Sequence, residues 1–432
     1  MTAAPSTEMT GAVAVVVGGG PAGLMAAEVL ATAGITVHVY EHMPSVGRKL
    51  LLAGRSGLNI THSEPLPALL ARYGDATAVR SAVAAFEPSA LREWCASLGE
   101  ATYVGSSGRV FPTAFRATPL LRAWLARLRD LGVHIHVRHR WVGWVVDEHG
   151  LPDSRRLRFH HDGRIGEVVA DVVVLALGGA SWPRVGSDGA WVPVLRAAGI
   201  DVRTLRPSNS GVRVAWSEVF TQQYAGVPLK NVALAVAGVT VRGDITITTD
   251  GLESGPVYTQ SAAVRDACER AHTCRLTIDL HPDLDASGVL TRLRKRRPKD
   301  SVSNTLRRTL GLQPVALGVL REATGNQLPA DDAALAALVK AVPLTSTGVM
   351  PLARAISTAG GIALAEIDDQ FMLRRLAGVF VAGEMLDWDA PTGGYLLQAS
   401  FSTAVAAAHG AAAWLATRTG PPQFSERPPA GR

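Results

Sequence analysis

The chain of 432 residues has few cysteines and no long hydrophobic run, and each absence excludes a class of protein. Its three cysteines, Cys95, Cys268 and Cys274, form neither a Cys-x-x-Cys pair nor a disulfide framework, which excludes a dithiol relay and favours a reducing compartment. Apolar runs such as 172–177 are far shorter than the roughly 20 residues that span a bilayer. The first ten residues lack the basic and apolar regions of a secretory signal. We therefore expect a cytoplasmic globular protein without a membrane partner.

The balance of charge is basic, with a net charge of +6 and a pI near 9.5. One dense basic run, RLRKRRPK, occupies residues 292–299. Such runs are more often a solvated helix face than a binding patch, and no nucleic-acid motif or interleaved aromatic residue accompanies this one. Nucleic acid is therefore the less favoured partner, although the basic pI keeps it open.

The clearest motif lies near the N-terminus, in AVAVVVGGGPAGLMAAEVLATAGITVHVYE at residues 12–41. Its apolar run 13–17 predicts a buried parallel strand. The strand leads into Gly18, Gly20 and Gly23, which have the spacing G-x-G-x-x-G. A helical stretch to Ala33 and a second strand at 35–40 follow. This order of strand, glycines, helix and strand is typical of a dinucleotide-binding fold.

Each part of the motif has a role in holding a dinucleotide. Gly18 permits the tight turn, Gly20 lets the backbone approach a pyrophosphate, and Gly23 lets helix and strand pack closely. The N-terminus of the helix, where Pro21 and Ala22 lie, presents unpaired backbone N–H groups to phosphates. We therefore predict a pyrophosphate at this turn.

The residues after the second strand indicate which dinucleotide is bound. Glu41 is placed to accept hydrogen bonds from an adenosine ribose, and an acid here disfavours a 2′-phosphate, which leaves FAD or NAD. Arg48 and Lys49 follow where the charge of a pyrophosphate needs neutralising, by charge-assisted contacts worth about 1.5–3 kcal/mol each. Asn59 lies in a turn-rich segment that suits an extended ligand.

A second junction of this kind lies near the C-terminus, in VFVAGEMLDWDAPTGGYLLQASF at 379–401. A strand at 376–382 and a helix from about 395 to 413 flank it. Its candidate ligand contacts are Gly383, Glu384, Gly393, Gly394, Tyr395 and Leu396. In a flavin enzyme the acid can bond the ribityl or phosphate region, and the helix N-terminus can stabilise the negative charge of a reduced flavin. Because NAD enzymes do not need contacts at both ends of a chain, FAD is favoured.

Two further segments are predicted strands. The run 171–177 predicts a buried strand that ends at Gly178-Gly179, and HIHVRHRWVGWVV at 134–146 predicts one strand that enters a hairpin with 157–160. His134 and His136 share one face of that strand, but no further ligand completes a set, so no metal site is expected.

The motifs GGGPAG, SVGRKLLLAGRSGLNITHSE, LALGGASWPRVGSDG, GLESGP and GVFVAGEMLDWDAPTGGYLLQASF together resemble the bacterial NAD(P)/FAD-dependent oxidoreductase family of bile-acid-inducible flavoproteins. Some of its members are described as aminoacetone oxidase family FAD-binding enzymes. The resemblance covers nearly the whole chain. It departs at Ser56-Gly57-Leu58-Asn59, where many members have Gly-Arg-Cys-Asn, and at 371–378, where many have Ser-Lys ahead of the last strand. We therefore place the chain in a distinct subgroup and do not transfer a substrate to it.

The resemblance implies an α/β fold with a Rossmann-like FAD-binding domain formed from both termini and an inserted β-barrel-like and helical domain. The domains are expected at 1–194, 195–342 and 343–432, with a disordered tail after 420. The FAD contacts that the resemblance implies are Gly18, Gly20, Ala22, Gly23, Glu41, Arg48, Lys49, Asn59, the backbone near Val142, Gly383, Glu384 and 393–396.

The expected function is that of an FAD-dependent oxidoreductase, which passes a hydride between flavin N5 and an unidentified small organic substrate. Without a second G-x-G-x-x-G unit, NADH or NADPH is expected to bind only transiently. An oxidase that uses oxygen, a flavin-binding nucleic-acid-modifying protein and a redox-silent flavoprotein stay as alternatives. His62 and Tyr395 lie in ligand-facing motifs, but no partner for either, and no signal for an oligomeric state, can be identified from the sequence.

Overall fold

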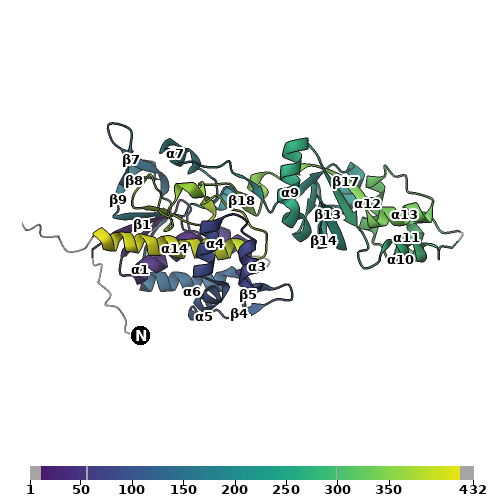
Figure 1. The fold of residues 1–432 in the computed structure, drawn as a ribbon, viewed down its shortest axis with the longest axis horizontal. Coiled ribbons are helices and arrows are strands. Elements are labelled where there is room, and N and C mark those ends of the chain that lie inside the picture. The colour runs from purple at the N-terminus through teal and green to yellow at the C-terminus, as the bar shows by residue number, and fades with distance from the viewer. Residues whose placement is uncertain (1–10, 55–56, 298, 419–432) are drawn as a thin grey trace, which may run out of the picture. The chain divides into compact units, whose positions relative to one another are not determined.

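The computed structural model describes residues 11–54, 57–297 and 299–418, which form two compact units (Figure 1). Unit 1 contains the chain up to Gly179, Pro183–Thr204 and the part from Gly360 onward. Unit 2 contains Ala180–Trp182 and Leu205–Ala359. The tail after 420, which the sequence analysis expects to be disordered, lies outside the described residues.

Unit 1 is built on a parallel five-stranded sheet to which both ends of the chain contribute. Its strand order is β19-β10-β1-β2-β6. The strands are β1 (Val13–Val17), β2 (Thr36–Tyr40), β6 (His134–His136), β10 (Val172–Leu175) and β19 (Val379–Val381). The central strands β1 and β10 are fully buried along most of their length, as expected for a parallel sheet covered on both faces. The prediction of a Rossmann-like domain from both termini is confirmed.

Two helices from opposite ends of the chain pack against each other in unit 1, α1 (Pro21–Thr32) and α14 (Tyr395–Arg418) (Figure 1). α14 buries several alanines along its length, and its Gly410 faces another segment, since a Cβ there would lie 2.5 Å from the carbonyl oxygen of Gln370. The other helices of this unit are α2 (Arg48–Ala53), α3 (Leu66–Ala71), α4 (Thr77–Ala85), α5 (Pro88–Ser97), α6 (Ala117–Asp130), α7 (Val192–Ala197) and the 3₁₀ turns η2 (Pro183–Val185), η4 (Leu364–Glu366) and η5 (Gly383–Met385).

Two small antiparallel sheets complete unit 1. One has the order β3-β5-β4, with β3 (Thr61–His62), β4 (Thr102–Val104) and β5 (Arg109–Pro112). The other has the order β7-β8-β9, with β7 (Arg140–Val146), β8 (Pro152–His161) and β9 (Arg164–Val169).

The prediction of one strand over 134–146 is wrong, although its hairpin with 157–160 is confirmed. The segment divides at Arg138, whose φ of 61° lies in the left-handed region and breaks the extended conformation. The first part, β6, joins the parallel sheet beside β2, whereas β7 pairs with β8.

Unit 2 contains a closed six-stranded barrel in the order β12-β15-β14-β13-β16-β17. Its strands are β12 (Val212–Val214), β13 (Pro228–Val236), β14 (Val239–Thr248), β15 (Gly251–Glu253), β16 (Cys274–Asp279) and β17 (Val342–Val349). Its helices are α8 (Glu218–Tyr224), α9 (Gly255–Ala271), α10 (Ala286–Leu293), α11 (Val302–Leu310), α12 (Pro314–Ala323), α13 (Asp332–Lys340) and the turn η3 (Leu352–Arg354). One apolar core joins barrel and helices, which confirms the predicted barrel-like and helical insert.

The boundaries of unit 2 differ from the predicted 195–342. Residues 195–204 belong to unit 1, where Val202 forms a bridge with Ile362. At the other end, β17 closes the barrel, and β18 (Ser357–Ala359) pairs with β11 (Arg206–Ser208), so the unit extends to Ala359. No described helix combines the length and the apolar character that a membrane span needs.

Candidate functional site

The glycine turn after β1 has the geometry that a dinucleotide fold requires. Gly18 has a φ of 109°, and a Cβ there would lie 2.3 Å from the carbonyl oxygen of Ala176 on the neighbouring strand connection. A Cβ on Gly23 would lie 1.8 Å from the oxygen of Gly18, so only glycine allows this approach of helix to turn. Gly20 is different, because a Cβ there would meet no described protein atom within 4 Å. Protein atoms therefore fill the space beside Gly18 and Gly23, whereas the space beside Gly20 is open.

The same turn leaves backbone donors unused. Gly18 donates to the oxygen of Tyr40 at 2.8 Å and Gly19 donates to Glu41, but the N–H groups of Gly20, Ala22 and Gly23 have no hydrogen-bond partner within the described residues. Pro21 opens α1 and has no N–H to satisfy. Free N–H groups at the positive end of a helix form a site for an anion such as a pyrophosphate.

Glu41 braces this turn from the end of β2. Its carboxylate accepts hydrogen bonds from the backbone N–H groups of Gly19, at 2.9 Å, and Met43, at 2.8 Å, and lies 3.1 Å from Nδ1 of His42. Burial alone would raise the pKa of Glu41, but the hydrogen bonds from His42, Met43 and Gly19 outweigh it and hold the pKa below its ordinary value. Oε2 accepts only from Gly19 in these contacts and can accept a second hydrogen bond, so Glu41 keeps capacity for a ribose hydroxyl.

A pocket opens beside Glu41, with about 380 Å³ between its walls, part of it open to solvent. Its walls come from the ends of β1, β2 and β10, the start of β7 and the segment before α7. The lining residues are Val17, Gly18, Tyr40, His42, His139, Arg140, Trp141, Leu177, Gly186, Asp188, Ala190 and Trp191. The pocket therefore lies at the carboxyl ends of parallel strands, where ligands bind in folds of this type.

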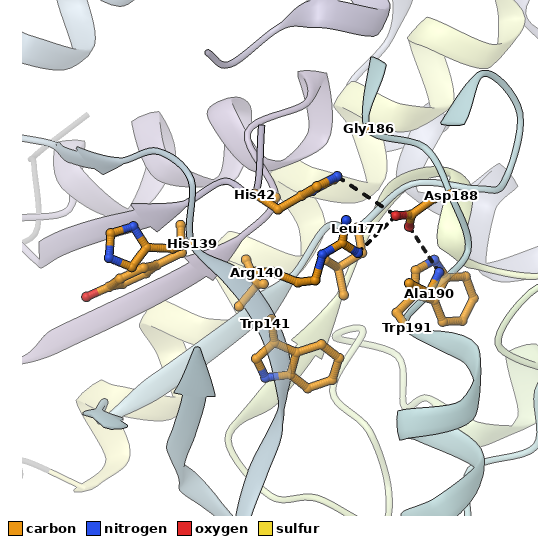
Figure 2. A pocket seen from close by; sticks show the side chains of 12 residues that line it. His42, His139, Arg140, Trp141, Leu177, Gly186, Asp188, Ala190 and Trp191 are labelled. Carbon is orange, nitrogen blue, oxygen red and sulfur yellow. Dashed lines mark hydrogen bonds and ion pairs between the residues drawn. The ribbon is translucent and has the colours of Figure 1, made fainter. Parts of the chain in front are cut away.

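The carboxylate of Asp188 forms the polar part of this pocket. Figure 2 shows His42 and Arg140 pointing toward Asp188, with nitrogen–oxygen distances of 4.0 and 2.9 Å. Burial would raise the pKa of Asp188, but the N–H of Ala190 and the guanidinium of Arg140 hold it below its ordinary value. Trp141, which also lines the pocket, is buried, and its Nε1 has no partner among the described residues. Flat rings and a fixed carboxylate suit an adenosine.

Val142 follows Trp141 on β7 at a break in the strand register, with 39% of its surface exposed. It directly follows the lining residues Arg140 and Trp141, and the resemblance implies an FAD contact for the backbone here. Four lining residues of the pocket were not predicted from the sequence: His42, Arg140, Asp188 and Trp191. The signal for the last two was the glycine-rich segment after β10, since such segments follow strands that end at a ligand.

The predicted contacts from opposite ends of the chain meet in a single ion pair. The ammonium group of Lys49 lies 2.6 Å from Oε2 of Glu384, although 335 positions separate them. The N–H of Gly179 approaches the same oxygen at 3.4 Å. A Cβ on Gly383 would lie 2.8 Å from the Cβ of Ala22, so the C-terminal junction packs on the helix that carries the glycine turn. The structure thus brings the N-terminal and C-terminal predictions together.

Three buried polar atoms near these contacts have no hydrogen-bond partner among the described residues. They are Nε of Arg48, Oδ1 of Asn59 and Oγ1 of Thr61. Native proteins rarely leave buried polar atoms unpaired without water or a ligand. Two of the three belong to the predicted FAD contacts, so the residues present fit an extended polar ligand.

The N-terminus of α14 is held against β3. Gly394 has a φ of 93°, and a Cβ there would lie 2.6 Å from the backbone of Thr61. The N–H groups of Tyr395, Leu396 and Leu397 have no hydrogen-bond partner within the described residues. This end of the helix therefore offers free donors and a positive dipole, as the sequence analysis expects.

Tyr395 and His62 have partners that the sequence analysis could not identify. The hydroxyl of Tyr395 donates to Oε1 of Glu64 at 2.6 Å, and Glu64 also accepts two hydrogen bonds from Arg72, at 3.1 and 2.8 Å. The ring of Tyr395 stacks on His62 at 5.3 Å. Its carbonyl accepts a hydrogen bond from Tyr73. We call Glu64, Arg72 and Tyr395 the carboxylate clamp.

The contacts of Tyr395 and His62 also determine where their protons lie. The pKa of Tyr395 is raised, first by burial and then by Glu64, so its hydroxyl keeps its proton. The N–H of Glu64 donates to Nδ1 of His62, so Nε2 carries the proton and donates to the oxygen of Ser107. Both residues are thus engaged in holding β3 and α14 together.

Comparisons with known proteins agree with this geometry. The family described as "HI0933-like protein Rossmann domain" matches residues 12–410. The 3-dehydro-bile acid delta(4,6)-reductase of Clostridium scindens is 25% identical over 92% of this chain and 98% of its own length. The ribosomal RNA dihydrouridine synthase of Haemophilus influenzae is 23% identical over 91% of this chain and 97% of its own length.

Among solved structures, the open conformation of a flavocytochrome c3 fumarate reductase superposes with a TM-score of 0.53. It covers 94% of this chain and 79% of its own, at 15% identity. At that identity the likeness shows a shared fold.

Proposed function

The chain belongs to the HI0933-like Rossmann family, and from that premise we propose that it is an FAD-dependent oxidoreductase that takes electrons from transiently bound NADH or NADPH. The observation that carries the proposal is the ion pair between Lys49 and Glu384, which joins two predicted ligand segments beside an open glycine turn. When bound, FAD supplies the two-electron chemistry. The protein supplies binding, orientation and charge.

The residues of the chain divide this work. The free N–H groups at Gly20, Ala22 and Gly23 would hold the pyrophosphate, with Arg48 and Lys49 adding positive charge. The pocket beside Asp188 would hold the adenosine, and Glu41 its ribose. The N-terminus of α14 would face the end of the flavin that becomes negative on reduction.

The names of the relatives suggest a substrate class. One is a reductase of a bile acid, and the other makes dihydrouridine. We infer that both reactions add two electrons and two protons to a carbon–carbon double bond. We propose the same reaction class here, for which bound FAD would supply a hydride and solvent the second hydrogen as a proton.

The reductase and the oxidase alternatives differ in one anaerobic experiment. The purified protein is mixed with NADH or NADPH without oxygen, and the visible absorbance of the flavin is followed. Bleaching by either nucleotide, with slow reoxidation in air, supports the reductase. Flavin that neither nucleotide reduces, but that passes electrons from a reduced substrate to oxygen, would support the oxidase instead of the reductase.

A second candidate function is the reduction of a base in RNA. The name of the Haemophilus influenzae relative suggests it, and the basic run at 292–299 in unit 2 favours it. Incubation of the holoprotein with NADPH and ribosomal RNA, followed by nucleoside analysis for dihydrouridine, tests this candidate directly.

A further inference from the structure

The positive charge of the chain is concentrated in one segment. Nine of the 43 basic residues but only three of the 37 acidic residues lie between Asp285 and Gln327, so outside this segment the two signs balance at 34 each. The segment holds α10, α11 and α12 of unit 2. The net charge of +6 is therefore a local property of these helices, and the rest of the chain is neutral.

Most of these cations are not used inside the protein. Arg296 pairs with Asp332 at 3.3 Å and Arg308 pairs with Asp300 at 2.7 Å. Six others are exposed and make no ion pair among the described residues: Arg292, Arg294, Lys295, Arg297, Lys299 and Arg307. Exposed cations without partners repel each other, and they destabilise the fold slightly unless an anion binds.

Internal contacts hold together the elements that carry these residues. Nη2 of Arg308 donates to the backbone oxygen of Lys295, which ties α11 to the segment after α10. Nη2 of Arg321 donates to Oγ of Ser303, which ties the end of α12 to the start of α11. Figure 1 shows α10 and α11 next to each other in unit 2. We call the six unpaired cations on these elements the basic surface.

The residue types in and around the basic surface indicate which kind of partner it binds. No large hydrophobic residue between 284 and 327 is exposed among the described residues, so the surface has no apolar anchor for a lipid bilayer. The segment also contains no aromatic residue on which an unpaired base could stack. Exposed cations alone, at the C-terminal ends of α10 and α11 and in the segment that follows α10, suit the regular phosphates of a double helix.

We propose that the basic surface binds the phosphate backbone of a base-paired nucleic acid. This inference does not rest on the flavin site, because the surface and its charges belong to unit 2. Six phosphate contacts predict a slope of about −5 in a plot of log affinity against log salt, equal to a loss of about 10³-fold between 50 and 200 mM salt. Sequence preference is expected to be weak, since backbone contacts carry no sequence information.

The test measures binding of the full chain to a labelled RNA hairpin, a DNA duplex of equal length, and a single strand. The variant carries R292Q, R294Q, K295Q and R297Q together. We expect at least a tenfold loss of affinity for the helical probes at about 100 mM salt, and a slope about four units shallower. Preference for the RNA hairpin or for the duplex identifies the source of the phosphates.

A matched control removes the same charge elsewhere. R80Q, R116Q, R122Q and R164Q lie outside the segment, at exposed positions without ion pairs among the described residues. This control should keep wild-type affinity and slope, and both variants should keep the melting temperature. Equal losses in both variants would show a response to net charge and overturn the proposal. Binding to vesicles of anionic lipid but to none of the nucleic acids would overturn it as well.

Discussion

Gly20 is the residue of the glycine turn beside which a ligand would have space. Its neighbours Gly18 and Gly23 are required by the protein itself, because a Cβ on either would collide with backbone oxygen. Gly20 has no such neighbour within the described residues. A side chain there is compatible with the fold and conflicts only with a ligand at the turn.

We therefore predict that Gly20→Arg folds but does not hold FAD. The arginine would fill the space in front of the free N–H groups, and flavin content should fall at least tenfold, as measured by absorbance of the purified protein. Gly166→Arg is the matched control, because Gly166 on β9 is also open to a side chain and lies on another sheet. Full flavin content in Gly20→Arg would contradict the proposal that the pyrophosphate binds at this turn.

The ion pair of Lys49 with Glu384 predicts a second loss of cofactor. Glu384→Ala removes a charge-assisted hydrogen bond worth about 1.5–3 kcal/mol and leaves Lys49 without that carboxylate. We expect FAD to bind at least tenfold more weakly, in a titration of the apoprotein by flavin fluorescence. Glu167→Ala, which breaks the exposed pair with Arg156, should leave FAD affinity unchanged. Wild-type affinity in Glu384→Ala would contradict the proposed two-ended site.

At the scale of elements, the important contact is between β3 and the first turn of α14. The carboxylate clamp holds this turn through the side chain of Tyr395, while Gly394 packs on Thr61. The free N–H groups of the turn can act on a reduced flavin only if they stay in place. The clamp thus has a positioning role, since it acts through the helix rather than by touching the substrate.

Tyr395→Phe should make the flavin harder to reduce. The change keeps the ring and its stacking on His62 but removes the hydrogen bond to Glu64. A helix terminus contributes about 0.3–1 kcal/mol to a nearby charge, so loosening it should lower the two-electron potential by up to about 20 mV. A dye-linked potential titration measures this shift, with the exposed Tyr103→Phe as the control. An unchanged potential would make the clamp purely structural.

The clamp also predicts how stability depends on pH. Hydrogen bonds from Arg72, opposed by burial, hold the pKa of Glu64 below its ordinary value of 4.5. A carboxyl group with a depressed pKa stabilises the folded state above pH 4.5, and this stabilisation is lost as the pH falls through the folded pKa. The difference in unfolding free energy between the wild type and Glu64→Gln should therefore be constant near neutral pH and shrink below pH 4.5. A difference in unfolding free energy that stays constant down to pH 3 would contradict this prediction.

The elements that were predicted well are those whose signals are local. The bounds of β1, α1 and β2 follow from an apolar run, three glycines and the helix between them, all within 30 residues. The division of 134–146 was missed because the left-handed conformation of Arg138 has no sequence signal such as glycine. The partner of Tyr395 was missed because Glu64 lies 331 positions away, and a single sequence carries no signal for such a contact.

At the scale of the whole molecule, the chain is a Rossmann-like unit formed from both termini and a barrel with helices inserted between them. The family match and the bile-acid reductase confirm the resemblance to bile-acid-inducible flavoproteins. The three cysteines are free, and burial raises the pKa of Cys95 to about 12, so this thiol keeps its proton near neutral pH. In the proposed function the redox chemistry is that of a bound cofactor.

The visible spectrum of the purified protein, with chromatography of the cofactor released by heat, tests the central claim most directly. The account predicts flavin absorbance, one FAD per chain, and no FMN or NADP in the released fraction. A colourless protein that does not take up FAD when the cofactor is added back would contradict the two-ended site and the function built on it.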